Sequence, residues 1–214
     1  MEDLSNYRKS YEKSELLETT IPKAPMALFT TWFREAELAN EIDEVNAMTV
    51  STIGLDGFPK ARVVLLKQFT DEGLVFYTNY DSEKGKAILA NPKICISFFW
   101  QALERQIIIK GSAEKIDEKT SDIYFKSRPL GSKMGAIVSN QSEIIASRAV
   151  LEENLKQLEK DFEGKEITRP KNWGGFIVKP SEIEFWQGRP NRLHDRIRYQ
   201  LQNDFSWKID RLSP

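Results

Sequence analysis

The sequence predicts an α+β fold in which helices surround an antiparallel β-barrel. Segments with strand-like alternation are followed by helical segments and then by strands again, without the strand–helix–strand rhythm of a parallel sheet. Several strand candidates are almost continuous apolar runs, as is typical of strands covered on both faces. The chain has 214 residues, of which 40% are hydrophobic, so it can bury a core without disulfides or metal ions.

The first elements are a charged arm, a helix and five strands. Residues 4–17 are highly charged with few apolar side chains, and we expect a loosely held helix or arm there. Pro25 precedes apolar residues at helical spacing as far as Leu38, which predicts a helix. Five strands are expected at residues 48–53, 61–66, 74–78, 94–100 and 106–113. Short turns link the first three, which predicts a three-stranded meander.

The middle of the chain is expected to be helical and the end to return to strands. A helix at residues 121–127 should end before Pro129, because the residue before a proline avoids the helical conformation. A longer helix is expected with Ser142 as its N-cap, running to Phe162, with Gly164 just past its end. Strands should resume at residues 175–179, 183–187, 192–200 and 207–209.

Composition and charge exclude several classes of function. There are 31 Lys and Arg against 32 Asp and Glu, so bulk charge does not indicate a nucleic-acid or membrane-surface binder. A single cysteine, Cys95, excludes an internal disulfide, and its apolar surroundings predict an inert core position. With His194 as the only histidine, Cys/His zinc sites and most multi-histidine sites are excluded, and we expect no metal.

Localisation and motifs narrow the class further. The sequence has no apolar run of membrane-spanning length, and its acidic, polar start is unlike a secretory signal, so we expect a soluble, cytoplasmic protein. It contains neither GxGxxG nor GxxxxGK[ST], so dinucleotide and P-loop binding lack support. The nucleophile motif GxSxG is also missing.

The most informative stretch lies between residues 184 and 196. If its second half is extended, alternation places Arg192, His194 and Arg196 on one face. Three such groups repel one another unless an anion or an electron-accepting ring lies opposite them. An ordinary charged edge strand, partly neutralised by neighbouring carboxylates, explains the pattern about equally well.

Two further constellations are weaker. Tyr124 and Arg128 share a helix face, and Ser132 is expected to cap the next short helix, so together they form a candidate phosphate site. Taken alone, a capped turn with Tyr124 in the core explains these residues better. Arg62 and Lys67 bracket an apolar run and would face opposite sides of a regular strand, as cations flanking a core strand commonly do.

The stretch from Glu184 to Arg196 reads Glu-Phe-Trp-Gln, four further residues, then Arg-Leu-His-Asp-Arg. It closely resembles the signature of the pyridoxine/pyridoxamine 5'-phosphate oxidase family. More blocks that resemble the family follow its order, at residues 62–67, 75–79, 103–106, 124–129, 139–142 and 207–212. The resemblance therefore covers the chain from about residue 20 onward, and ordered blocks are far more specific than any single one.

The resemblance implies a Greek-key split β-barrel that binds FMN and is active as a homodimer with the flavin at the subunit interface. It implies a mobile N-terminal arm at residues 1–19 and a single FMN-binding domain at residues 20–214. The implied reaction oxidises pyridoxamine or pyridoxine 5'-phosphate to pyridoxal 5'-phosphate, in the biosynthesis and salvage of that cofactor. Oxygen would accept the electrons, giving hydrogen peroxide and, from the amine, ammonia. The flavin would carry the redox chemistry while the protein supplies orientation and charge.

By motif position, the resemblance implies which residues bind each group. FMN would be held by Arg62, Val63, Val64, Leu65, Leu66, Lys67, Tyr77, Thr78, Lys84, Gln106, Gln141, Ser142, Trp186 and Arg196. The substrate would be held by Lys67, Tyr124, Arg128, Ser132, Arg192, His194, Arg8 and Tyr11. The implied catalytic residues are Arg192, which would orient the substrate, and His194, a weaker candidate base. Glu83 departs from the family's basic residue near the FMN phosphate, and should weaken flavin binding unless it points away.

Two alternative functions stay open. Another split-barrel flavin or deazaflavin reductase would keep the flavin phosphate site but lack the substrate residues, and would show nicotinamide-dependent reduction. A non-enzymatic carrier of pyridoxal phosphate or haem need not bind flavin, and a haem would use His194 as its axial ligand.

Overall fold

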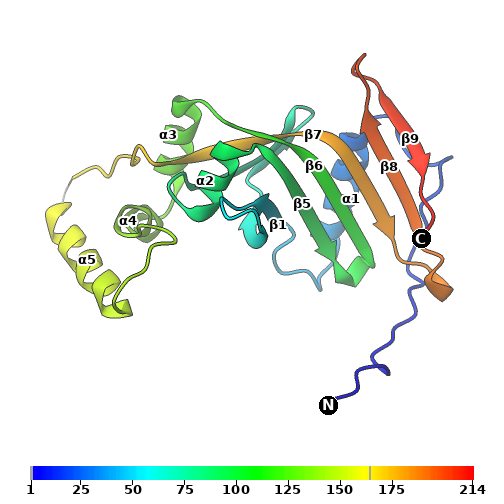
Figure 1. Cartoon of the computed structure of the whole chain (residues 1–214), viewed down its shortest axis with the longest axis horizontal. Helices are drawn as coiled ribbons and strands as arrows, with labels where there is room; N and C mark the ends of the chain where they lie inside the picture. Colours follow the sequence, from blue (N-terminus) through cyan, green and yellow to red (C-terminus); the bar gives the residue numbers. More distant parts are fainter. Residues whose placement is uncertain (1, 164) are drawn as a thin grey trace.

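The computed structural model describes residues 2–163 and 165–214, so Gly164 lies outside the described residues. A curled antiparallel sheet with helices around it confirms the α+β fold (Figure 1). The strands are β1 (Ala47–Ile53), β2 (Pro59–Leu65), β3 (Gln68–Thr70), β4 (Gly73–Asn79), β5 (Lys93–Trp100), β6 (Arg105–Lys115), β7 (Trp173–Gln187), β8 (Asp195–Leu201) and β9 (Trp207–Arg211). The α-helices are α1 (Pro25–Leu38), α2 (Glu83–Ala90), α3 (Glu118–Ser127), α4 (Leu130–Val138) and α5 (Arg148–Asp161).

Strand β7 pairs with three other strands of the sheet. The strand order is β2-β1-β5-β6-β7-β4-β3; in addition, β8 pairs with β7, and β9 pairs with β8. Its first half pairs with β4 as far as Val178, and its second half pairs with β8 from Glu182. Pro180 falls between these two partners, where its missing N–H removes no ladder bond to either of them. On the other edge, the pairing with β6 shifts by one residue between Lys110 and Gly111.

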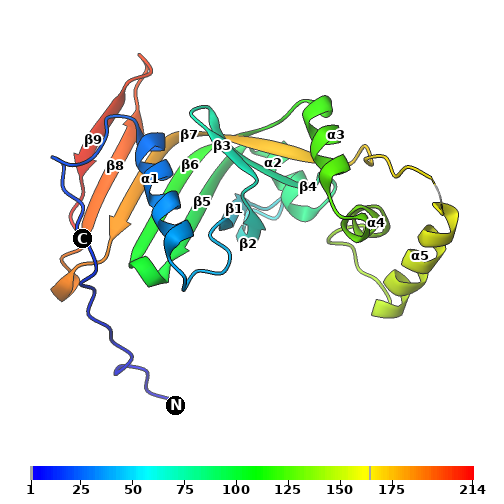
Figure 2. The same ribbon diagram turned by 180° about the vertical axis from the view of Figure 1, so that it is seen from behind.

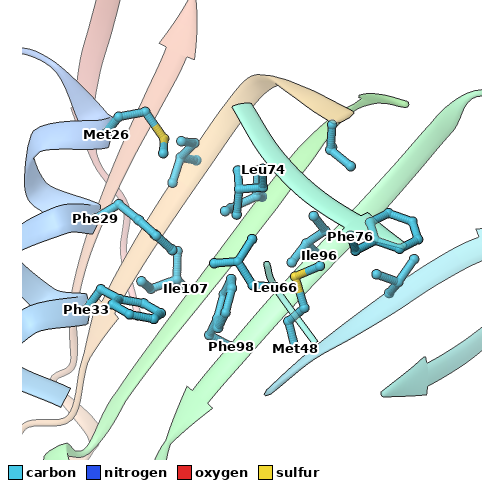
Figure 3. Packing of buried hydrophobic residues seen from close by; sticks show 14 of the residues in the cluster. Met26, Phe29, Phe33, Met48, Leu66, Leu74, Phe76, Ile96, Phe98 and Ile107 are labelled. Carbon is cyan, nitrogen blue, oxygen red and sulfur yellow. The ribbon is translucent and has the colours of Figure 1, made fainter. Parts of the chain in front are cut away.

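The main core lies between α1 and the concave face of the sheet. Figure 2 shows α1 crossing in front of β5, β6 and β7. Figure 3 shows Met26, Phe29 and Phe33 of this helix pointing toward the side chains of the sheet, among them Phe98. The rings of Phe29 and Phe98 have centroids 5.4 Å apart and meet edge to face. Burying each such side chain contributes roughly 1.5–3 kcal/mol, so this helical face fixes α1 on the sheet.

A smaller core lies at the far end of the molecule, under α3, α4 and α5 (Figure 1). Phe125, Met134, Ile167 and Trp173 are its buried members. Trp173 begins β7, so this second core fixes the three helices against the start of the longest strand. One wall of the functional site is built from the same elements.

The pairing of the early strands differs from the predicted meander. Only β1 and β2 form a hairpin, while β4 pairs with β3 and β7. The chain crosses the barrel after β2, and the backbone N–H of Lys67 donates to the carbonyl of Val75 at 2.8 Å. The predicted meander is therefore wrong, because the curl of the sheet brings β4 beside the first half of β7 and not beside β2.

Left-handed backbone conformations correct two predicted boundaries. Ser142 has a φ of 76° and does not cap a helix; α5 begins at Arg148, after Ser147. Asn191 and Arg192 have φ values of 56° and 62°, so β8 begins only at Asp195. Such angles are incompatible with both helix and strand geometry, and alternation cannot reveal them.

Two further boundary predictions are wrong. The strands expected at residues 175–179 and 183–187 are a single strand, β7, bent by its irregular pairing at residue 180. Helix α4 begins after Pro129, which leaves Ser132 inside the first turn and not at the N-cap. Helix α2 was not predicted from the sequence. It begins after Ser82, whose Oγ accepts a hydrogen bond from the backbone N–H of Gly85 at 3.2 Å.

The N-terminal segment has neither helix nor strand between residue 2 and the start of α1. Leu16 is nevertheless 4% exposed and belongs to the main core, so the later part of this arm is fixed to the barrel. Among residues 2–163 and 165–214, no helix combines the length and hydrophobicity needed to cross a lipid bilayer.

Candidate functional site

A cavity of about 660 Å³ lies where β2 and β4 face α3 and α4. We call it the cationic cavity. The predicted site residues that it brings together are Val63, Val64, Leu65, Lys67, Tyr77, Thr78, Lys84, Tyr124, Arg128, Ser132 and Gln141. The lining residues that the sequence did not single out are Asn79, Pro129, Gly135, Ala136, Ser139 and Trp173.

The Lys84 ammonium is positioned by the start of α2. Its Nζ donates to Thr78 Oγ1 at 3.2 Å and to Gln141 Oε1 at 3.0 Å. Burial lowers the pKa of Lys84, and the nearby positive charge of Arg62 lowers it further. A partly buried ammonium close to another cation favours an anionic ligand, and the N-terminus of α2 adds its partial positive charge.

Arg62 and Glu83 lie at the rim of this region. Arg62 Nη1 donates to Thr52 Oγ1 and to the carbonyl of Lys60, both at 2.8 Å. The Glu83 carboxylate is 2.5 Å from Lys60 Nζ, and both side chains are largely exposed. The acid that replaces the family's basic residue therefore pairs with a lysine on β2 and does not line the cationic cavity.

Arg128 leaves α3 at its C-terminal end and enters the opposite wall of the cavity. Its guanidinium lies 4.6 Å from the centre of the Trp173 ring. Its Nη1 atom is buried and has no hydrogen-bond partner within the described part of the chain. Burial lowers the pKa of Arg128, since the charged form loses solvation there. A buried donor of this kind is costly unless a ligand accepts from it.

Aromatic stacking joins the two walls of the cavity. The rings of Tyr77 and Tyr124 are stacked, with centroids 3.8 Å apart and an angle of 17° between planes. Trp173 extends the stack, 5.5 Å from Tyr77. Tyr124 therefore lies on the cavity wall and also packs, half-buried, against the smaller core, so the interpretation of it as a core residue holds in part.

Electrostatically, the cavity suits anions with flat rings. Within the ranges 2–163 and 165–214, its lining contains the cations Lys67, Lys84 and Arg128 and no carboxylate. Hydroxyl groups of Thr78 and Ser132 add further donors. This chemistry matches phosphate groups attached to aromatic rings. No group of three or more potential metal-ligating side chains occurs in the same ranges.

Four other predicted residues gather at the far end of β7, in what we call the tryptophan cluster: Trp186, Tyr11, Arg192 and His194. The Trp186 ring is 4.7 Å from His194 and 5.8 Å from Tyr11, which meets it edge-on. A second cavity of about 610 Å³ here is lined by Tyr11, Arg192, His194 and Arg8. The cluster thus includes the predicted catalytic pair and Tyr11, and the other predicted arm residue, Arg8, lines the cavity beside it.

His194 has a defined tautomer. The backbone N–H of Arg189 donates to His194 Nδ1 at 3.1 Å. An accepting Nδ1 carries no proton, so the neutral imidazole carries its proton on Nε2. Burial lowers the pKa of His194, and the charge of Arg192 lowers it further. At neutral pH the ring therefore offers an N–H donor at Nε2, which argues against the weaker prediction that it acts as a base.

The remaining predicted residues have other partners. Arg196 lies in β8 and pairs with Glu184 through contacts of 2.7 and 3.1 Å. Arg192 and His194 precede that strand, so the prediction of one shared strand face with Arg196 is wrong. Gln106 is opposite Trp186 in the sheet register. Two others line neither cavity. Leu66 is buried in the main core, and Ser142, at the rim of the cationic cavity, accepts at Oγ from the backbone N–H of Glu83 at 3.3 Å.

The two groups of residues are separated along β7. Tyr77 is opposite Gly175 in the register, whereas Trp186 is eleven positions further along the same strand. At about 3.3 Å per residue this is roughly 35 Å of strand. One chain therefore presents half of the predicted site at each end of its longest strand.

Comparison with known proteins decides the family. The pyridoxamine 5'-phosphate oxidase family model matches residues 35–160. A second model, the pyridoxine 5'-phosphate oxidase C-terminal dimerisation region, matches residues 173–214. The chain belongs to the pyridoxamine 5'-phosphate oxidase family. The dimerisation region begins with β7 and contains Trp186, Arg192 and His194 of the tryptophan cluster.

Relatives in this family are similar over their whole length. The pyridoxine/pyridoxamine 5'-phosphate oxidase of Flavobacterium psychrophilum is 74% identical over 214 residues, covering all of both chains. That of Flavobacterium johnsoniae is 71% identical over 213 residues, with 100% of both chains covered. These names do not favour the two alternatives, a reductase and a carrier.

Solved structures show the same fold. PhzG from Burkholderia lata, crystallised with tetrahydrophenazine-1-carboxylic acid, superimposes with a TM-score of 0.87 at 27% identity, covering 95% of this chain and 100% of that one. A pyridoxamine 5'-phosphate oxidase-related, FMN-binding protein from Nostoc punctiforme gives 0.70 at 13% identity, covering 91% and 100%. The expected split-barrel fold is confirmed.

Proposed function

We propose that this chain is an FMN-dependent oxidase that converts pyridoxamine and pyridoxine 5'-phosphate to pyridoxal 5'-phosphate. The amine, oxygen and water would give the aldehyde, ammonia and hydrogen peroxide; the alcohol and oxygen would give the aldehyde and hydrogen peroxide. The observation that carries the proposal is the unpartnered, buried Arg128 nitrogen in a cavity whose lining is cationic. Full-length relatives with this oxidase name support it.

The residues of the cationic cavity fit FMN. Lys84, Arg62 and the N-terminus of α2 supply the charge that a flavin phosphate requires, and Glu83 is already paired with Lys60. Arg128, Ser132 and Tyr124 would hold the substrate phosphate on the other wall. When bound, FMN would accept the two electrons that leave the 4' carbon of the substrate.

We propose further that each site is shared by two chains of a homodimer. The tryptophan cluster is roughly 35 Å of strand away from the cationic cavity of its own chain. A two-fold interface brings the same surface of both copies together, so each copy can complete the other. The match of the cluster's segment to a dimerisation region supports this arrangement.

In the complete site, the chain's residues bind, orient and hold protons. Arg128 would hold the substrate phosphate and so fix the orientation of the substrate. A substrate held in this way reacts without a further bimolecular encounter. Arg192 would orient the reacting end, and the His194 Nε2–H would donate to an acceptor on the substrate. Cations around the cavity would stabilise negative charge as electrons arrive.

An anaerobic visible spectrum, recorded before and after adding pyridoxamine 5'-phosphate, tests the proposal. We expect a flavin spectrum that bleaches on addition. A flavin spectrum that stays oxidised would contradict the oxidase and favour a reductase. Failure to bind FMN, even after reconstitution, would favour the carrier.

A further inference from the structure

Glu104 is a buried carboxylate outside both groups of site residues. It ends the short turn Gln101–Leu103 between β5 and β6, its φ is 56°, and its side chain is 2% exposed. Its backbone carbonyl accepts from the N–H of Gly188 at 2.8 Å, at the end of β7. Left-handed residues other than glycine are uncommon and are frequently found at functional sites.

The carboxylate of Glu104 is bound by the N-terminal arm. Its Oε2 accepts from the backbone N–H of Glu12 at 2.8 Å and of Lys13 at 3.0 Å. Its Oε1 lies 3.5 Å from Lys9 Nζ. Burial raises the pKa of Glu104, but the hydrogen bonds from Lys13, Glu12 and Lys9 outweigh this and lower it overall. The group is therefore ionised at neutral pH, and charge-assisted bonds to the arm compensate its burial.

Gly188 provides a second contact between the arm and the end of β7. A Cβ atom at this position would lie 2.8 Å from both Cβ and Cγ of Tyr11. Only a glycine leaves room for the Tyr11 ring, which packs edge-on against Trp186. Glu104 therefore binds the backbone just after Tyr11, and Gly188 leaves room for the Tyr11 side chain.

We infer that Glu104 is a positioning residue that holds the N-terminal arm over the tryptophan cluster. The inference rests on the proposed function, in which this cluster contacts the substrate. By fixing residues 12 and 13, the carboxylate restricts Tyr11 to the region beside Trp186 and His194. Loss of the charge should release the arm and weaken substrate binding, while leaving the barrel and the cationic cavity intact.

The test compares Glu104→Gln with Glu114→Gln in the FMN-loaded, full-length protein. Glu114 lies near the other end of β6, the strand that follows Glu104, and pairs with Lys179 on the surface, so it is a matched control. Trypsin cleavage after Lys9 and Lys13 reports arm release without requiring activity. We expect E104Q to be cleaved at least about tenfold faster, as the loss of a charge-assisted hydrogen bond predicts. Its KM for pyridoxamine 5'-phosphate should rise by about as much, with kcat within about twofold of the wild-type value.

Gly188→Ala provides an independent variant if E104Q folds poorly. It displaces Tyr11 directly, and we expect the same faster cleavage and the same rise in KM. Cleavage and KM at wild-type values in E104Q would overturn the inference, as would a fall in kcat alone. Faster cleavage of E104Q with an inactive wild-type enzyme would uphold the attachment of the arm and contradict the proposed oxidase instead.

Discussion

A buried guanidinium nitrogen without a partner costs free energy, and Arg128 carries one on the wall of the cationic cavity. The protein recovers part of that cost by stacking the group on Trp173. A phosphate would recover the rest through two charge-assisted hydrogen bonds. The helix-face spacing of Tyr124 and Arg128 predicted this site, but the sequence contained no signal for Trp173, which enters from a distant strand.

Replacing Arg128 with Met should raise the KM for pyridoxamine 5'-phosphate by roughly 10- to 100-fold, the loss expected for one or two hydrogen bonds to a charged group. Steady-state kinetics with pyridoxamine, which lacks the phosphate, provide the comparison, because R128M should barely change them. Arg148→Met, at an exposed pair with Glu152, is the control. Equal losses for both substrates would contradict the assignment.

The tautomer of His194 makes a different prediction. Gln can supply an N–H near the Nε2 position, so His194→Gln should retain activity within about tenfold, whereas His194→Leu should lose about 100-fold. Since the pKa of His194 is lowered, wild-type kcat/KM should stay level down to about pH 6.5. Below that pH, His194 gains a proton on Nδ1, and two N–H donors would then face each other, that of Nδ1 and the backbone N–H of Arg189. Activity should therefore fall. If H194Q were as inactive as H194L, the result would contradict the donor role and indicate that His194 acts as a base.

At the scale of secondary structure, alternation located the strands but not their pairing. Alternation reports which faces are covered locally, whereas pairing depends on how the whole sheet curls. The sequence therefore predicted a strand near β4 correctly but placed it beside β2, not β7. The short helix expected after Ser132 is α4, but it begins two residues before Ser132, at Leu130, with Pro129 at its N-cap.

The bulge in β7 opposite Gly111 makes a prediction about stability. A Cβ at Gly111 would lie 2.3 Å from the carbonyl oxygen of Lys179, a backbone atom that cannot move aside cheaply. We expect Gly111→Ala to destabilise the fold by at least about 2 kcal/mol. Gly131→Ala, where nothing lies within 4 Å, should instead stabilise it by up to about 1 kcal/mol. Urea denaturation of both variants measures this, and similar values would refute the role of the bulge.

The arm is attached to β9 through Arg211, which gives a pH dependence. Arg211 Nη2 donates to Glu18 Oε2 at 2.7 Å, and this bond lowers the pKa of Glu18 from its usual 4.5 to about 2. A lowered folded-state pKa stabilises the fold above the unfolded value and loses that effect as the pH falls toward 2. The difference in unfolding free energy between wild type and Glu18→Gln should therefore be constant near about pH 6 and shrink below about pH 4.5. A difference that stays constant into acid would exclude this ion pair as a contributor.

For the whole molecule, the chief consequence of the fold is that β7 separates the cationic cavity from the tryptophan cluster. Motif resemblance gave Arg128 and Arg192 as members of one substrate site, because a sequence does not reveal distance. Roughly 35 Å of strand β7 separates the two ends at which they lie, and the segment of Arg192 lies in a dimerisation region. The residues were predictable; their division between two ends of the molecule was not, since it depends on one strand having two successive partners.

The most direct test of the shared site is complementation between two impaired variants. Arg128→Met impairs the cationic cavity and Arg192→Leu impairs the tryptophan cluster, and each should retain FMN but lose most of its kcat/KM for pyridoxamine 5'-phosphate. Co-expression should form heterodimers in which one of the two sites has no substitution. With random pairing, the mixture should recover about one quarter of wild-type kcat/KM per chain. Activity no higher than that of the separate variants would show that each chain completes its own site, and would contradict the account.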